Sequence, residues 1–348
     1  MISKYLLAKR VLKMGKKIRM ADIAQELGIS VVSVSKGLAG KDGVSEEMRG
    51  RILEKAKELG YSGKTQPLEK PVSKQAKSRS IGILSADRFF DENTFYTNLY
   101  REILIQCTAQ GDFAIMELVT PKAEHTCILP TIVTEKKVDA LIFMGQIDRN
   151  YLETVSQCGL PYLLLDFYDD TLSADCVLSD NLAGGYQLTR YLLGKGFQKI
   201  GFIGSICATS SNMDRYLGVV RALLEAGITP KPEWRMEDRD ERGIFIPFHL
   251  PQELPEAFIC SCDEVAFNLV EYLTGKGIRV PEDVAVTGYD DYRYSTITRP
   301  PLTSYRVNVP GMARTAVKLI RQKLDGKPIL LPKNTIPGKI IIRESTER

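Results

Sequence analysis

Hydrophobic residues recur at helical spacing in three short segments near the start of the chain. The segment 20–27 (MADIAQEL) gathers its apolar residues on one helical face, and Gly28 marks its end. Ser30 is suited to cap a second helix over 31–38 (VVSVSKGL). A third helix is predicted between Ser45 and Gly60. The expected inward residues of the second and third helices are Val34, Leu38, Met48, Ile52, Ala56 and Leu59. Together the segments predict a compact three-helix unit.

The pattern changes after residue 80, where short apolar runs alternate with helical patterns. The runs are IGILSA, FAIMELV, DALIFMG, PYLLLDF, CVLSD, KIGFIG, AFICSC and DVAVTGYDD. Buried strands that alternate with helices predict parallel sheets in an α/β body. The runs divide into two sets around SDNLAGG, which indicates two similar subdomains. Most runs end in a small or acidic residue, and ligands of such sheets bind beyond the carboxyl ends of the strands.

Charge separates the two parts of the chain. Residues 1–80 hold 18 Lys and Arg against 8 Asp and Glu, whereas the rest holds 29 against 35. A basic segment joined to a mildly acidic body is typical of a polyanion-binding head, although a solvated charged surface would look the same. Residues 62–80 contain two prolines and five basic residues, which favours a linker.

Composition narrows the class of protein. Seven scattered cysteines without a CxxC pair, and two histidines, argue against a disulfide framework, a metal site and a cofactor, and favour a reduced, cytoplasmic setting. No apolar run approaches ~18 residues, so a membrane span is excluded. The start of the chain lacks the apolar core of an export signal. An enzyme is disfavoured because the chain shows no P-loop, nucleophile–base set or GxGxxG motif.

A helix, a glycine turn and a second helix form the helix-turn-helix pattern, whose second helix enters the DNA major groove. The serines of that helix can donate to phosphates, its lysine can reach guanine acceptors, and its first valines can pack on thymine methyl groups. The alternative is a core helix hairpin without a DNA role. The candidate DNA-binding residues are Ser30, Val31, Val32, Ser33, Ser35 and Lys36.

The stretch from Ile18 to Tyr61 resembles the headpiece of the LacI/GalR family of bacterial transcription regulators. The likeness continues through IGIL, VDALIFMG, SDNLAGG, KIGFIG, VPEDVAVTGYDD and PPLTSYRV, and covers about 330 residues. It implies a three-helix headpiece followed by a core that resembles a periplasmic sugar-binding protein, with two parallel-sheet subdomains closing on an effector. It also implies a homodimer that binds double-stranded operator DNA and a sugar-like effector.

The resemblance also implies effector-binding residues. An arginine and two acids above an aromatic floor suit a polyhydroxylated ligand, because charged groups form strong hydrogen bonds to hydroxyls. The alternative for each residue is a helix-terminal ion pair or core packing. The residues that match are Phe95, Tyr96, Asp169, Arg215 and Asp290.

The expected organisation has four parts. They are an N-terminal extension (1–17) expected to be disordered, the headpiece (18–62), a linker or hinge (63–80) and the core (81–348). Residues 81–178 and 307–331 are assigned to the first subdomain, and residues 179–306 and 332–348 to the second.

Four departures from the family pattern are visible. The Pro-Asn and Ala-Arg-x-Leu hinge motif is missing between Tyr61 and Ile81. Arg19 replaces the capping threonine of the first helix, which is expected to cost ~1 kcal/mol of helix stability. Cys262 replaces an effector-binding asparagine, after a segment whose prolines at 247, 251 and 255 disfavour a helix. The chain has no terminal leucine heptads, so a coiled-coil tetramer is not implied. The competing functions are a solute-binding protein, exported or cytoplasmic, without a DNA role, and a sugar-active enzyme.

Overall fold

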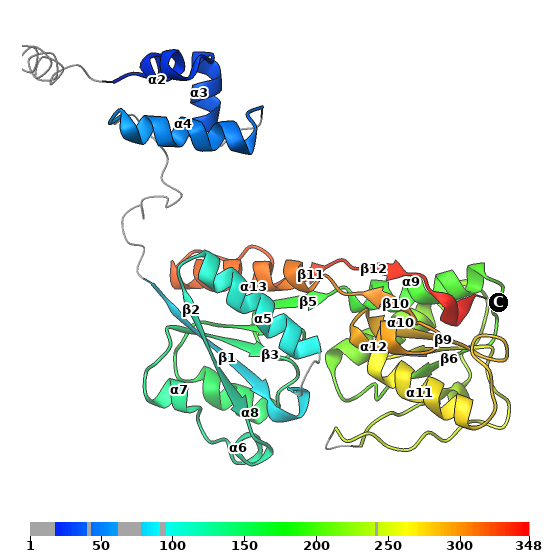
Figure 1. Ribbon diagram of the computed structural model, residues 1–348. Coiled ribbons are helices and arrows are strands. Elements are labelled where there is room, and N and C mark those ends of the chain that lie inside the picture. The colour runs from blue at the N-terminus through cyan, green and yellow to red at the C-terminus, as the bar shows by residue number, and fades with distance from the viewer. Residues whose placement is uncertain (1–17, 40–42, 62–77, 91–94, 241–242, 348) are drawn as a thin grey trace, which may run out of the picture. The chain divides into compact units, whose positions relative to one another are not determined.

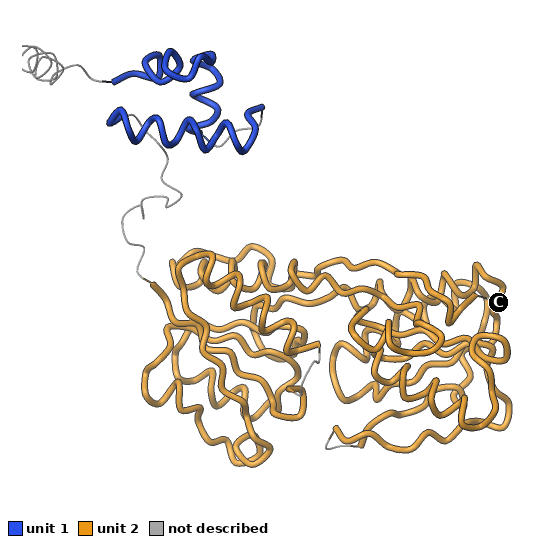
Figure 2. Tube along the Cα trace, in the orientation of Figure 1, with its two compact units in different colours: residues 1–77 blue, residues 78–348 orange. Residues whose placement is uncertain are grey.

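The computed structural model describes residues 18–39, 43–61, 78–90, 95–240 and 243–347. The chain divides into two compact units, residues 1–77 and residues 78–348 (Figure 2). The expected N-terminal extension and nearly all of the expected linker lie outside the described residues. Each unit is described below by itself.

Unit 1 is a three-helix domain, as the sequence pattern predicts. Its helices are α2 (Met20–Leu27), α3 (Val31–Leu38) and α4 (Glu46–Glu58). Gly28 ends α2 in the left-handed conformation, with φ of 65°, and the Ser30 and Ser45 side chains cap α3 and α4. The buried core consists of Ile23, Ala24, Val34, Leu38, Ile52 and Ala56.

The start of α2 is capped by an acidic side chain of the helix itself. Arg19 occupies the N-cap position, where its side chain offers no acceptor to the first amides. The Asp22 carboxylate accepts a hydrogen bond from the Arg19 backbone N–H at 2.7 Å. This bond is one half of a capping box, and it offsets part of the helix stability that is expected to be lost because Arg19 replaces a capping threonine.

Unit 2 contains two six-stranded sheets, each at the centre of one lobe (Figure 1). The first sheet, with the order β11–β5–β4–β3–β1–β2, pairs only in parallel. The second has the order β12–β10–β9–β8–β6–β7, in which β12 alone is antiparallel to its neighbour within the described part of the chain. The strands are β1 (Ser80–Ala86), β2 (Phe113–Val119), β3 (Ala140–Met144), β4 (Tyr162–Leu165), β5 (Cys176–Ser179), β6 (Ile200–Ile203), β7 (Arg235–Met236), β8 (Ala257–Cys260), β9 (Ala285–Asp290), β10 (Thr303–Arg306), β11 (Lys333–Ile336) and β12 (Lys339–Ile341).

Helices cover both sheets, as parallel strands buried on both faces require. The first lobe contains η1 (Asp87–Phe89), α5 (Phe95–Ala109), α6 (Pro121–Thr126), α7 (Thr131–Thr134), α8 (Arg149–Ser156) and α13 (Val309–Leu324). The second contains α9 (Asn181–Gly194), α10 (Ser210–Glu225), η2 (Pro232–Trp234), α11 (Asp263–Gly275), α12 (Arg293–Ile297) and η3 (Glu344–Thr346). The chain crosses between the lobes after β5, after β10 and after β11.

The last crossing corrects one expected boundary. Residues 332–348 were assigned to the second subdomain, but Lys333–Ile336 pair in parallel with β5 and extend the first sheet. The edge of β5 would otherwise present unpaired backbone groups, which β11 satisfies. The chain therefore returns to the second lobe at residues 337–338, between β11 and β12.

Candidate functional site

Helix α3 presents the candidate DNA-binding side chains outside the core of unit 1. Val31 and Val32 are 47% and 64% exposed, and Lys36 is exposed as well, whereas Val34 is fully buried. Valines outside a core have apolar surface free to contact a partner such as a thymine methyl group. We call the surface formed by these residues the α3 outer face: Ser30, Val31, Val32, Ser33, Ser35 and Lys36.

Two serines organise the amino end of α3. The Ser30 oxygen accepts from the Ser33 backbone N–H at 3.0 Å, and the two hydroxyl oxygens lie 2.9 Å apart. One hydroxyl hydrogen is used between the oxygens, so the other remains available to a phosphate. The positive end of the helix dipole favours an anion at the same place.

The Lys36 side chain lies over Gly43, which has φ of 100°. A Cβ at Gly43 would stand 3.1 Å from Lys36 Nζ, so a glycine leaves the ammonium room to pack there. The exposed ammonium can reach a base from this position by rotation of its flexible stem.

In unit 2, two buried carboxylates stand at the carboxyl ends of strands from opposite lobes. Asp166 follows β4 with φ of 68°, and Asp290 ends β9 with φ of 96°. The left-handed conformation is uncommon for residues other than glycine and often marks functional sites. One oxygen of each carboxylate is buried without a hydrogen-bond partner in the described part of the chain. Each lobe therefore contributes an acceptor that lacks a donor.

Arg215 of α10 is held close to Asp290. Its Nε donates to Asn181 Oδ1 at 2.9 Å, and its Nη1 donates to the Ser261 carbonyl. Its Nη2 lies 3.6 Å from Asp290 Oδ1, which is an ion pair too long for a hydrogen bond. The Tyr289 ring lies beneath the guanidinium, with its centroid 3.8 Å from Cζ. These contacts fix the guanidinium beside the cleft carboxylates.

Tyr96, near the start of α5, joins the cluster from the first lobe. Its hydroxyl donates to Asp166 Oδ2 at 2.9 Å. Its ring lies over Gly145, where a Cβ would stand 3.0 Å from the ring carbons. Phe95 packs edge-on against Tyr96 with 5.2 Å between centroids, so it supports the cleft aromatic. Tyr96, Arg215 and Asp290 are thus brought together as the resemblance implies.

Burial decides the electrostatics of the cluster. It raises the pKa of Asp166 to about 6, although Arg215 and the Tyr96 hydrogen bond act in the opposite direction. Burial also raises the pKa of Asp290 against the influence of Arg215. The pKa of Tyr96 lies well above its ordinary value because of burial and the neighbouring Asp166. The charged carboxylates are therefore under-compensated, and donors from a ligand would stabilise them.

Asp169 does not take the place in the cluster that the resemblance implies. Its carboxylate accepts two hydrogen bonds from Arg149, at 2.9 and 3.0 Å, and two from Thr171. Burial alone would raise the pKa of Asp169, but these bonds hold it below its ordinary value. Asp166, three residues earlier, is the acid that faces Arg215, because it is the first residue beyond the strand.

Sequence reasoning missed Asp166 and Asn181 as site residues. Asp166 directly follows β4, in LLLDF, whereas Asn181 begins α9 one residue after the N-cap Asp180. The rule that ligands bind beyond strand ends favours the first polar residue after a strand, and that signal would have selected Asp166 but not Asn181.

Cys262 stands at the N-cap of α11, where the family pattern has an asparagine. Burial raises the pKa of its thiol to about 12, so the group is neutral at ordinary pH. The preceding segment contains no helix among its described residues, as its prolines predict. One wall of the cleft therefore differs from the family pattern.

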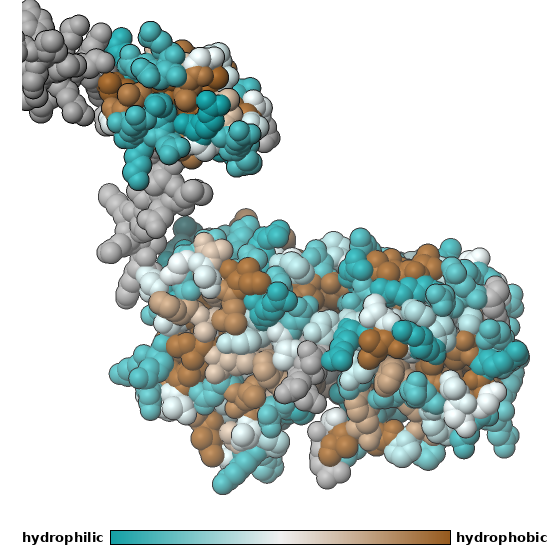
Figure 3. All heavy atoms as spheres, in the orientation of Figure 1, coloured by the Kyte–Doolittle hydropathy of each residue, from teal (hydrophilic) through white to brown (hydrophobic). Residues whose placement is uncertain are grey.

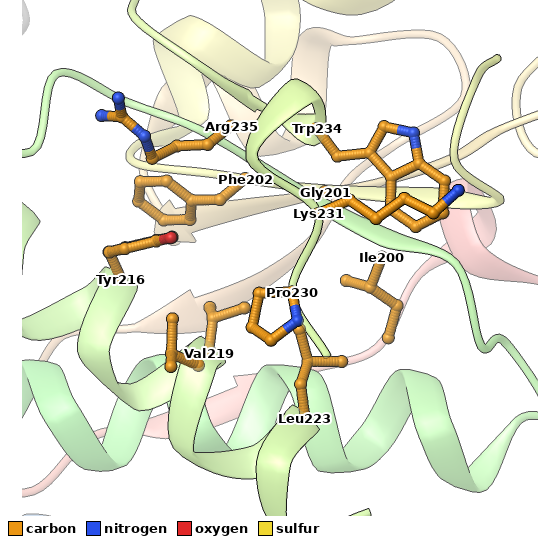
Figure 4. Close-up of a pocket in the computed structure, with 11 residues that line it drawn as sticks. Ile200, Gly201, Phe202, Tyr216, Val219, Leu223, Pro230, Lys231, Trp234 and Arg235 are labelled. Carbon is orange, nitrogen blue, oxygen red and sulfur yellow. The ribbon is translucent and has the colours of Figure 1, made fainter. Parts of the chain in front are cut away.

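Outside these two groups of residues, the described structure offers no comparable candidate for a binding site. A small hollow beside α10 and β6 is lined by Phe202, Tyr216, Val219, Pro230 and Trp234 and belongs to the packing of the second lobe (Figure 4). The described residues contain no cluster of His, Cys, Asp and Glu suited to a metal ion. In the same residues, every helix is too short or too polar to cross a membrane.

Comparison with known proteins gives matches in both units of the chain. Residues 19–63 match the family model for bacterial regulatory proteins of the lacI family, and residues 189–346 match the periplasmic binding protein-like domain. The chain is 29% identical to the HTH-type transcriptional regulator RegA of Clostridium saccharobutylicum, over 93% of this chain and 98% of RegA. It is 26% identical to the HTH-type transcriptional repressor PurR of Pasteurella multocida, over 94% of this chain and 98% of PurR.

Solved structures share the fold. The transcriptional regulator CelR in complex with cellobiose matches with a TM-score of 0.65 at 20% identity, over 94% of this chain and 99% of that chain. The Lac repressor dimer bound to operator and the anti-inducer ONPF matches with a TM-score of 0.64 at 21% identity, over 95% and 99%.

Proposed function

We propose that this LacI-family transcription regulator is a cytoplasmic homodimer that reads a roughly palindromic operator through α3 and responds to a small effector bound between its lobes. The observation that carries the proposal is the α3 outer face, where exposed valines stand beside phosphate-binding groups and a lysine. A core helix hairpin would turn its valines inward, whereas Val31 and Val32 are exposed.

The roles on α3 follow from side-chain chemistry. The hydroxyls of Ser30, Ser33 and Ser35 donate to phosphate oxygens and fix the register on the duplex. Lys36 donates to guanine acceptors in the major groove, and the two valines contact thymine methyl groups. Two-fold symmetry of the dimer would place one half-site under each α3.

An apolar surface on the first lobe supports the dimer. Strand β2 is the edge of its sheet, and apolar side chains on β2 and the neighbouring α5 reach the surface. Ile105 and Leu118, on the side of the sheet that α5 covers, are 46% and 37% exposed, and apolar spheres gather over this lobe in Figure 3. Exposed apolar patches of this kind mark interaction sites, and a second copy would bury it.

The cleft favours a ligand rich in hydrogen-bond donors. Asp166 and Asp290 each present a buried carboxylate oxygen without a hydrogen-bond partner in the described residues, one from each lobe. A polyhydroxylated molecule such as a sugar donates to both carboxylates at once and so connects the lobes.

Hydrogen bonds between the loop after β4 or β3 and helix α10 provide the coupling between the lobes. Ser211 donates to the Asp166 carbonyl at 2.8 Å, and the Ser210 backbone N–H donates to Gln146 at 3.2 Å. The Tyr168 hydroxyl donates to Asp214 at 2.9 Å, and its backbone N–H donates to the Ser210 hydroxyl oxygen at 3.2 Å. A change in lobe closure alters these bonds, and an effector that prefers one closure shifts the population of DNA-binding dimers.

Sequencing of DNA that co-purifies with the protein tests the proposal. Enrichment of a short palindromic sequence is the expected result, and its neighbouring genes indicate the effector class. Recovery of DNA without any shared motif would contradict sequence-specific regulation.

A further inference from the structure

Arg239 is held rigidly on the second lobe, just beyond β7. Its Nε donates to Asp238 Oδ2 at 3.0 Å, and Asp238, which is fully buried, also accepts from the Ser205 backbone N–H at 2.6 Å. Arg239 forms an isolated β-bridge with Phe245, whose ring lies 4.4 Å from the guanidinium carbon. One side of the guanidinium is therefore fixed by a carboxylate and one face by a ring.

The opposite end of the guanidinium lacks an oxygen acceptor. Among the described residues, the one contact of its terminal nitrogens is between Nη2 and the Cys262 sulfur at 3.9 Å, and sulfur is a weak acceptor. The Arg239 side chain is 19% exposed, so little water reaches it. Three of the four N–H groups of the terminal fork thus have no partner among the described residues, and the fourth has only this weak one, so the fork can donate to a ligand.

This fork lies near Arg215, at the carboxyl end of β8. Cys262, which contacts Arg239, follows Ser261, whose carbonyl accepts from Arg215. The two guanidiniums therefore flank consecutive residues at the carboxyl end of β8. Arg239 is also close enough to Asp290 to lower the pKa of that carboxyl against the effect of burial.

We propose that Arg239 binds an anionic group of the effector, a phosphate or a carboxylate, while Asp166 and Asp290 bind its hydroxyls. A planar guanidinium matches the oxygens of either anion in a bidentate manner, and its free edge provides that geometry here. The effector class is then an anionic polyol, such as a sugar phosphate or sugar acid. This inference rests on the proposed function, because it assigns the ligand of the same cleft.

Binding of simple probes to the full-length protein tests the assignment. Inorganic phosphate, glucose 6-phosphate, glucuronate and glucose are titrated at constant ionic strength, with chloride as the reference anion and thermal unfolding or calorimetry as the readout. The variants are Arg239→Met, which keeps the apolar stem, and Arg235→Met as the matched control. Arg235 lies on the adjoining strand β7 and pairs with Glu237 at 2.6 Å.

The wild type is expected to bind a phosphate or carboxylate probe saturably. Arg239→Met should lower this affinity by about tenfold or more, and Arg235→Met should leave it unchanged. Preference for glucose 6-phosphate or for glucuronate identifies the anion. Equal anion binding by wild type and Arg239→Met, or a wild type that binds the probes no better than chloride, would overturn the assignment. Operator capture by the wild type is measured separately. A wild type that captures a specific operator but binds no anionic probe would overturn the role of Arg239 and leave the proposed function standing.

Discussion

Asp166 and Asp290 belong to different sheets, yet both direct a buried carboxylate toward Arg215 from the left-handed backbone conformation. Both carboxylates raise the pKa of Tyr96, and each has an oxygen without a hydrogen-bond partner within the described structure. The buried charges of the two acids are therefore unfavourable until a donor binds them. An effector that donates to both acids, as we propose, would favour one closure of the lobes.

Asp166→Asn should stabilise the effector-free protein at neutral pH. The pKa of Asp166 is raised to about 6, so the folded state binds the proton more tightly, and the free energy of unfolding falls as pH rises from about 4 to 6. The variant lacks this fall and should gain ~1–3 kcal/mol relative to wild type between pH 4.5 and 7.5. Urea unfolding of unit 2 at both pH values measures the difference.

Asp169→Asn is the matched control for this measurement. The pKa of Asp169 is held below its ordinary value by Thr171 and Arg149, so its contribution is present at neutral pH and is lost on acidification. This variant should therefore be less stable than wild type at pH 7.5. The same sign for both variants would contradict the assigned electrostatics.

Asp290→Asn should weaken effector binding by about one to two decades, because it removes a charged acceptor for a ligand hydroxyl. Operator affinity without effector should stay within about a factor of two, because Asp290 belongs to unit 2 and the candidate DNA-binding residues to unit 1. Calorimetry with the effector indicated by the operator's neighbouring genes provides the test. Wild-type affinity in the variant would show that other residues hold the ligand.

Substitution of Arg215 would test effector binding less cleanly than Asp290→Asn, because Arg215 also contributes to the stability of the fold. It is 6% exposed and bonds to Asn181 and Ser261. Removal of the guanidinium leaves Asp290 without its ion pair, and breaking a buried pair costs about 3–5 kcal/mol. Arg215→Ala should therefore lower the unfolding midpoint of unit 2 as well as the effector response. An unchanged midpoint would show that these bonds do not stabilise the fold.

Lys36→Ala should weaken operator binding by ~1–3 kcal/mol and relax the preference at one base pair, because a base contact carries that much discrimination. Lys57→Ala is the matched control, since Lys57 is an exposed lysine of α4 and not one of the residues of the α3 outer face. Binding assays on operator and random DNA separate the roles. Equal losses on both DNAs for Lys36→Ala would assign Lys36 to phosphate contact alone.

Arg19→Thr should stabilise α2 by ~1 kcal/mol, because a hydroxyl at the N-cap accepts from the first amides while Asp22 retains its bond to the backbone N–H of residue 19. Hydrogen exchange of α2 peptides should slow several-fold. Unchanged or faster exchange would show that the Asp22 bond already suffices for the cap.

Local sequence patterns predicted most of the fold. The caps at Ser30 and Ser45 and the left-handed Gly28 are local features, and each appears as expected. Strand β11 was missed because KNTI is short and polar, and its pairing with β5 is decided by an open sheet edge about 150 residues away in sequence.

The site was harder to predict than the fold. Asp290 ends strand β9, so the pattern and the resemblance both point to it, whereas Arg215 lies within helix α10 and only the resemblance points to it. Asp169 and Asp166 are both acids of one loop, and the choice between them depends on which one Arg149 engages. Arg239 contacts Cys262 through the fold of an irregular segment, for which periodicity provides no signal.

Operator affinity measured with and without the effector, for wild type and Asp290→Asn, tests the central claim most directly. The account predicts that the effector changes the operator affinity of wild type at least fivefold, a typical coupling between sites, and that the variant at the same effector concentration shows little change. An operator affinity that is indifferent to a bound effector in wild type would contradict the claim that the cleft controls the DNA-binding unit.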